Sequence, residues 1–179
     1  MLLEKELISE CICGNRTAQK ELYEKYSPYF FAICMRYMPT REDAEDVLVT
    51  GFASIFSKLD TYKEDGSFEG WMKRIIINKA LTTLRINNRH HGMKEEMKEW
   101  EQDKILTSEN MVYTKINTKD IMKQIQQLPA GYRVVFNLHA IEGYSYEKIS
   151  NILNINKGTV SSQMAKARKI LQKNLQDFK

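Results

Sequence analysis

Apolar residues recur at helical spacing from Leu128 to Leu175, with polar and basic residues between them. The pattern predicts a short helix over 146–153, capped by Ser145, and a longer helix that Asn156 caps. A tight turn around Ile155, the expected buried pivot, joins the two. This arrangement predicts a helix-turn-helix.

The predicted second helix divides into an apolar stripe and a polar face. The stripe advances in steps of four, three and four: Val160, Met164, Ala167 and Leu171. The residues that face away from it are Ser161, Ser162, Ala165, Lys166 and Lys169. Short hydroxyls and cations on a second helix suit the major groove of DNA, so nucleic acid is the leading partner. The alternative is an ordinary helical hairpin with a solvated basic face.

Further helices are expected on both sides of the chain's middle. Upstream of the pair, Leu128-Pro129 ends one helix, and another runs from Tyr132 to Ile141 with Val135, Leu138 and Ile141 inward. The first 90 residues predict helices over Glu4 to Gly14, Ala18 to Tyr37, Thr40 to Phe56 and Trp71 to Arg85. In the second of these, the inward positions are Leu22, Tyr26, Tyr29, Ile33 and Tyr37, and Pro28 predicts a kink or break.

Composition supports an all-helical protein, and no motif in the sequence indicates a cofactor. The 179 residues include only 3 Pro and 8 Gly, and suffice for one ordinary domain or two small ones. We expect a cytoplasmic protein, because no apolar run approaches the ~20 residues of a membrane span and the cysteine count is odd. Cys11 and Cys13 with His90 and His91 are a zinc alternative that the Cys-x-Cys spacing disfavours.

Charge is unevenly distributed, although the net charge is only +4. Residues 40 to 70 are predominantly acidic, whereas residues 71 to 94 contain basic side chains and no acidic ones. Such segregation separates a surface for a basic partner from a surface for phosphates.

Two segments resemble known sequences. The segment "LPAGYRVVFNLHAIEGYSYEKISNILNINKGTVSSQMAKARKIL" is similar to region 4 of bacterial sigma factors of the extracytoplasmic-function (ECF) group, and also to the DNA-binding domains of some response regulators. The segment with "REDAEDVLVTGFASIF" and "SFEGWMKRIIINKALTTLR" resembles region 2 of the same group. Two matches in the right order identify the chain as a member of the sigma-70 family.

The resemblance implies two small helical domains: 1–90 as region 2, 119–179 as region 4, and a flexible linker over 91–118 between them. It implies a factor that binds core RNA polymerase, at the β′ clamp and β flap, and recognises the −35 and −10 promoter elements, assisting −10 strand opening. An anti-sigma factor is a further partner that the family commonly has. The competing functions are a stand-alone helix-turn-helix regulator and a nucleic-acid-processing enzyme, and no nucleophile beside a base or phosphate-binding loop supports the latter.

The resemblance also implies roles for individual residues. Polymerase contact falls on the acidic helix, with the two apolar members serving as contact or core: Asp43, Glu45, Asp46, Leu48 and Phe52. Contact with the −10 element falls on Phe68, Trp71, Arg74, Asn78, Lys79, Arg85 and Arg89, and the 63–70 loop resembles the segment that captures a flipped base. Trp71 is equally a core candidate. The −35 candidates are Lys157, Thr159, Ser161, Ser162 and Lys166, and Arg168 either contacts DNA or braces its own domain.

The chain departs from the family pattern at three places. Val49-Thr50 replaces a common Gln-acidic pair, Thr82 stands where many relatives have Asp, and Ser161 where many have Lys or Arg. These departures alter residues at the expected polymerase contact and on both expected DNA-binding helices, without affecting the expected fold.

Overall fold

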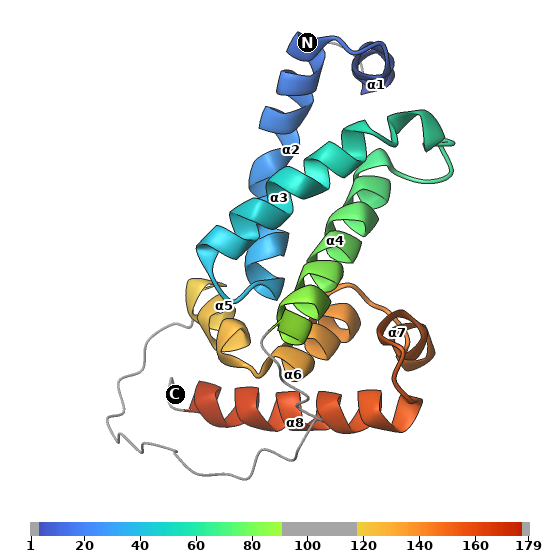
Figure 1. Cartoon of the computed structure of the whole chain (residues 1–179). Coiled ribbons are helices and arrows are strands. Elements are labelled where there is room, and N and C mark those ends of the chain that lie inside the picture. Colours follow the sequence, from blue (N-terminus) through green and yellow to red (C-terminus); the bar gives the residue numbers. More distant parts are fainter. Residues whose placement is uncertain (1–3, 91–117, 177–179) are drawn as a thin grey trace. The chain divides into compact units, whose positions relative to one another are not determined.

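The computed structural model describes residues 4–90 and 118–176, which are helical apart from short connections (Figure 1). The predicted all-α fold is confirmed for these ranges. The chain divides into two compact units, 1–93 and 94–179, which we call the first and second units. The predicted linker lies almost wholly outside the described residues. No helix among the residues described is both long and apolar enough to cross a membrane.

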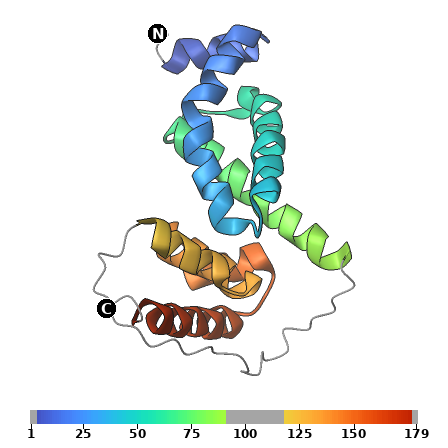
Figure 2. The ribbon, with the colours of Figure 1, turned by 90° about the vertical axis from the view of Figure 1, so that its left-hand side faces the viewer.

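The first unit contains α1 (Glu4–Ile12), α2 (Arg16–Tyr37), α3 (Arg41–Phe56), the short 3₁₀ turn η1 (Leu59–Thr61) and α4 (Phe68–His90). Helices α2, α3 and α4 pack against one another (Figure 2). Side-chain caps fix where α2 and α3 begin. Asn15, just before α2, accepts hydrogen bonds at Oδ1 from the backbone N–H groups of Thr17 and Ala18. Thr40 Oγ1 accepts a hydrogen bond from the backbone N–H of Asp43 in α3, which confirms the predicted Thr40 cap.

The first unit's core is rich in aromatic and branched side chains. Its largest fully buried members include Phe30, Tyr37, Phe52, Ile55 and Ile76. Helices α3 and α4 approach closely at Gly51, where a Cβ atom would lie 2.5 Å from Ile76 Cδ1. Glycine at this position therefore lets the acidic and basic helices share one core.

One inward position predicted for α2 was wrong. Tyr29 is 42% exposed, and its neighbour Phe30 occupies the core position instead. Both residues satisfy the three-or-four spacing from Tyr26, so spacing alone did not separate them. Pro28 lies within α2, which runs without a break from Arg16 to Tyr37, so the helix accommodates the missing backbone donor.

The second unit contains α5 (Thr118–Gln127), α6 (Ala130–Phe136), the π-helical turn η2 (Asn137–Ile141), α7 (Tyr146–Leu153) and α8 (Lys157–Gln176). Helix α8 packs against α6 and α7. The apolar stripe of α8 is buried as predicted, and two of its members, Ala167 and Leu171, form a cluster with Ile125 and Leu128.

The segment from Tyr132 to Ile141 is not one regular helix. After Phe136 the backbone changes to the wider π-turn, which rotates the following side chains relative to an α-helical register. Val135 and Leu138 are buried as predicted, but Ile141 is 40% exposed, so its inward placement was wrong. Ile155, the predicted buried pivot, is only half-buried.

Candidate nucleic-acid interface

Helix α4 begins in an aromatic cluster. The ring centroids of Phe68 and Trp71 lie 5.8 Å apart and nearly parallel, and Tyr62 lies 5.1 Å from Phe68 and 5.5 Å from Trp71. The sequence predicted Phe68 as a contact for a −10 base. Its side chain is only 2% exposed, so Phe68 is a core residue and is not accessible to a base. Trp71 is half-buried in the cluster, so it serves the core and still has an exposed part.

The outer face of α4 is polar and basic. Arg74, Asn78 and Arg85 are exposed and follow one another at helical intervals, so they lie along one face. Thr82, on the same face, donates its hydroxyl hydrogen to the Asn78 carbonyl at 2.9 Å. Lys79 is half-buried, and the Arg89 side chain lies outside the described residues. The structure thus groups three of the predicted −10 residues on one accessible surface.

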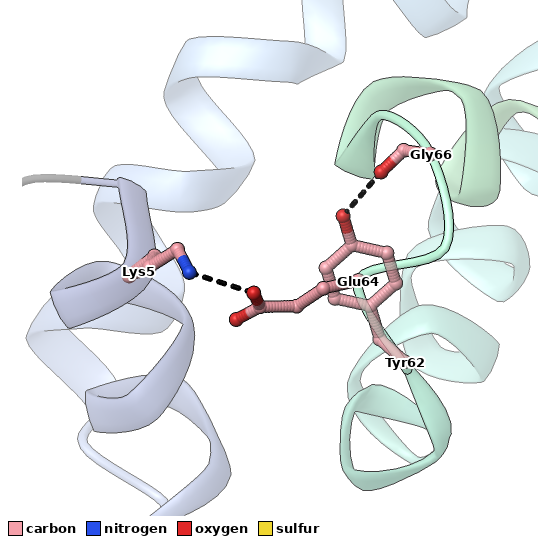
Figure 3. Close-up of polar contacts among 4 residues, drawn as sticks. All are labelled: Lys5, Tyr62, Glu64 and Gly66. Atoms are coloured by element: carbon pink, nitrogen blue, oxygen red, sulfur yellow. Dashed lines mark hydrogen bonds and ion pairs between the residues drawn. The ribbon is translucent and has the colours of Figure 1, made fainter.

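The loop before α4, residues 62–67, is closed by its own polar contacts. The Tyr62 hydroxyl donates to the Gly66 carbonyl at 2.8 Å (Figure 3). Two residues have left-handed backbone, Glu64 with φ of 58° and Gly66 with φ of 99°. Glycine adopts this conformation freely, whereas glutamate rarely does, so Glu64 is held in an uncommon geometry.

Helix α3 presents its carboxylates and buries its apolar residues. Asp46 is exposed, Glu45 forms an exposed ion pair with Arg41 at 2.8 Å, and Asp43 accepts a hydrogen bond from the Thr40 hydroxyl at 2.6 Å. Leu48 and Phe52 are 6% and 2% exposed. Leu48 and Phe52, predicted as either polymerase contacts or core residues, are therefore core residues. The carboxylates are the accessible members of the predicted polymerase contact.

A groove beside α3 was not anticipated from the sequence. It has a volume of about 410 Å³, between α2 and α3, and its walls include Tyr23, Phe31, Arg41 and Val49. The Arg41 guanidinium lies 5.2 Å from the Phe31 ring centroid, a cation–π contact that joins the two helices. Val49, one of the departures from the family pattern, is 59% exposed here. The spacing of polar and apolar residues along α3 indicates which side of this helix faces outward. It does not indicate which residues of α2 form the other wall of the groove.

Helix α8 starts on an Asn156 cap. Asn156 Oδ1 accepts the backbone N–H of Thr159 at 2.7 Å and its hydroxyl hydrogen at 3.0 Å, which confirms the predicted cap. The turn before it depends on Asn154, which ends α7 in the left-handed conformation. This geometry fixes where α8 begins, and so which of its side chains face outward.

The predicted −35 residues fall on the outer side of α8. Ser161, Ser162 and Lys166 are exposed, as is Lys157 at the helix start. Thr159 is half-buried, and its hydroxyl is already engaged by the cap, so it is less available than expected. Arg168 is exposed, which favours contact with a partner over bracing the domain. The outward residues of α8 thus form an accessible surface of hydroxyls and cations, with the helix's apolar stripe buried on the other side.

Among the described residues, no group of three or more His, Cys, Asp or Glu side chains is placed to hold a metal ion. Cys11 is buried and Cys13 is exposed, so their thiols do not share a surface. The side chains of His90 and His91, the other half of the zinc alternative, lie outside the described residues.

Comparison with known families assigns both units. Residues 22–90 match the family described as Sigma-70 region 2, and residues 118–171 match Sigma-70, region 4. The ECF RNA polymerase sigma-E factor of Escherichia coli K12 is 26% identical over 183 residues, covering 98% of this chain and 95% of that protein. The RNA polymerase sigma-H factor of Pseudomonas aeruginosa is 27% identical over 181 residues, covering 97% and 94%.

Solved structures show the same fold. The sigma factor RpoE from Bartonella quintana, in complex with the anti-sigma factor NepR, superposes with a TM-score of 0.55 at 21% identity, covering 88% of this chain and 96% of that one. CnrH, in complex with the cytosolic domain of CnrY, gives a TM-score of 0.50 at 19% identity, covering 97% of each chain. The chain therefore belongs to the ECF group of the sigma-70 family, non-enzymatic factors that bind core RNA polymerase and promoter DNA and direct promoter-specific transcription initiation.

Proposed function

We propose that this protein brings core RNA polymerase to promoters by placing α8 at the −35 element and α4, with the 62–67 loop, at the −10 element, where it assists strand opening. It acts in the cytoplasm, where bacterial polymerase and chromosome meet. The observation that carries the proposal is the separation of exposed charge: carboxylates on α3, and cations with hydroxyl and amide groups on α4 and α8.

Recognition of the −35 element is assigned to the outer face of α8. Ser161 and Ser162 are short enough to let the helix approach base edges, and Lys166 lies about one turn beyond Ser162 on the same face. Lys157 is at the helix start, where backbone N–H groups and a cation together favour a phosphate. Because each phosphate contact releases counterions, this binding should weaken steeply as salt is raised.

Recognition and opening of the −10 element are assigned to α4. A separated strand needs cations for its backbone and polar or aromatic surfaces for its exposed bases. Arg74 and Arg85 supply exposed cations, and the Asn78 amide between them can both donate to and accept from a base. The exposed part of Trp71 lies at the same end of α4 as the loop, and can stack on a base.

Attachment to polymerase is assigned to α3 and its flanking groove. The exposed carboxylates Glu45 and Asp46 would steer and orient α3 against a basic surface of the β′ clamp, and Val49 beside them offers apolar contact. The second unit would engage the β flap. One neighbouring fold, RpoE, was solved with the anti-sigma factor NepR bound, and this supports an anti-sigma partner here as well.

The test is to separate promoter binding from promoter opening. Core polymerase with the full-length protein is placed on promoters selected from a randomised library, closed complexes are measured by gel shift and open complexes by permanganate reactivity of unpaired thymines. Arg74→Ala should reduce opening more than closed binding, whereas Lys166→Ala should reduce closed binding. Equal losses of both from Arg74→Ala would mean that this residue only positions the duplex.

A stand-alone helix-turn-helix regulator would give a different result. Such a protein binds its duplex tightly without polymerase and does not make core polymerase initiate. Tight binding alone, with no initiation, would overturn the proposal.

A further inference from the structure

Helix α1 lies outside the segment that matches Sigma-70 region 2, which begins at residue 22, yet it is firmly docked on that segment. Leu7 and Cys11 are 2% and 3% exposed. On the same helix, Glu4 Oε1 accepts a hydrogen bond from the Tyr26 hydroxyl of α2 at 2.7 Å. Helix α1 thus has a fixed place on the first unit.

From that place α1 reaches the 62–67 loop. Lys5 Nζ donates to Glu64 Oε2 at 2.6 Å, a contact between residues 59 positions apart (Figure 3). Glu64 is the loop residue with left-handed backbone. An unfavourable backbone conformation persists only where surrounding contacts hold it. The contact from Lys5 on one side and the Tyr62–Gly66 hydrogen bond on the other provide two such contacts.

The contact also changes the charge of the loop. Glu64 and Asp65 are both exposed, and they precede the helix that carries Arg74 and Asn78. An unpaired carboxylate so close to a nucleic-acid backbone would repel its phosphates. Lys5 compensates the negative charge of Glu64, and the Glu64 side chain points toward Lys5 on α1, as Figure 3 shows.

We propose that α1 is a positioning element of the −10 site, in which Lys5 holds Glu64 and thereby sets the conformation and charge of the 62–67 loop. The inference rests on the proposed function, which assigns this loop and α4 to the −10 element. Lys5 acts through Glu64 and contacts no base itself.

The chain offers a matched control. The Lys5 and Glu64 side chains are 79% and 60% exposed, and a pair this exposed contributes little to folding, so reversing its charges leaves the unit folded. Lys20 and Glu24 on α2 form another ion pair, at 3.7 Å, with side chains 75% and 64% exposed. Reversal of Lys20 makes the same change in net charge on the first unit without touching the loop.

The experiment measures base extrusion in the full-length holoenzyme. Promoters selected with the wild type carry 2-aminopurine at each −10 position in turn, and the rise in fluorescence reports a base leaving the stack. Five proteins are compared: wild type, Lys5→Glu, Glu64→Lys, the double exchange of both, and Lys20→Glu. Affinity for core polymerase, measured in parallel without DNA, verifies that each variant folds and assembles.

We expect Lys5→Glu to slow the fluorescence rise about three- to five-fold, the range of a lost exposed ion pair, with affinity for core unchanged. The double exchange should return the rate to within about two-fold of wild type, because the pair is restored with opposite polarity. Lys20→Glu should resemble wild type. A general structural role for α1 would lower affinity for core together with base extrusion, so slowed extrusion with unchanged affinity, rescued by the exchange, assigns the effect to the loop.

Two results overturn the inference. Both apply when the wild type extrudes a base normally. If Lys5→Glu extrudes the base as fast as Lys20→Glu, or if the double exchange does not restore the rate of base extrusion, then Lys5 does not position the loop. If the wild-type holoenzyme extrudes no base at any −10 position, the proposed function itself fails, and this inference with it.

Discussion

Phe52 gives the sharpest test of how the acidic helix is built. Its ring is 2% exposed and lies 4.7 Å from the Tyr23 ring, 5.9 Å from Phe30 and 6.0 Å from Phe56, measured between centroids. Phe52→Ala removes these contacts and leaves a cavity that rigid helices cannot fill. Such a change costs about 3–5 kcal/mol, a large part of the roughly 5–15 kcal/mol that stabilises a typical domain.

The assay is urea unfolding of the first unit. The chain has 2 tryptophans, so a Trp100→Phe background leaves Trp71, which packs 5.8 Å from Phe68 in the first unit, as the reporter. Phe52→Ala should lower the midpoint without changing the slope. Val49→Ala, on the same helix but at a 59% exposed position, should alter the free energy of unfolding by no more than about 0.5 kcal/mol. A loss below about 1 kcal/mol for Phe52→Ala would refute the packing described, and return this residue to the list of polymerase contacts.

Three further predictions concern other parts of the chain. Asn156→Ala should lower the thermal stability of the second unit by about 1 kcal/mol, since it removes the cap of α8, and an unchanged melting curve would contradict that cap. Lys166→Ala should reduce the dependence of log K on log salt by about one unit if this lysine neutralises a phosphate, whereas an unchanged slope would place it at a base edge or in solvent. Ellman's reagent at mildly alkaline pH should react rapidly with Cys13 alone. Burial raises the pKa of the Cys11 thiol to about 11 and that of Cys34 to about 12, so their reactive thiolates form only at higher pH. Three equally fast thiols would show that the first unit opens.

Local chemistry made much of the fold predictable from sequence. The caps at Thr40, Ser145 and Asn156 depend only on a side chain and the backbone within three residues, and all three form as expected. The buried stripe of α8 follows from the period of one regular helix.

Prediction failed where a tertiary contact or an irregular turn decides the outcome. Ile141 is exposed because it lies at the end of the π-turn, which breaks the expected α-helical register. Phe68 is buried because Tyr62, Trp71 and Tyr26 surround it, and the spacing of these residues in the sequence does not predict this arrangement. The same limit applies to the candidate site. The outward cations of α4 and α8 follow from helical periodicity, but the contact from Lys5 to Glu64 spans 59 positions, and only the folded chain brings the two together.

The measurement that bears most directly on the whole account is run-off transcription with purified core polymerase and the full-length protein on a genomic fragment library. We expect transcripts that require the protein and start downstream of a common pair of short sequence elements, with dependence on the upstream element lost when the second unit is deleted. A preparation that binds those fragments tightly by itself, and yields no specific transcript with core polymerase, would contradict the account.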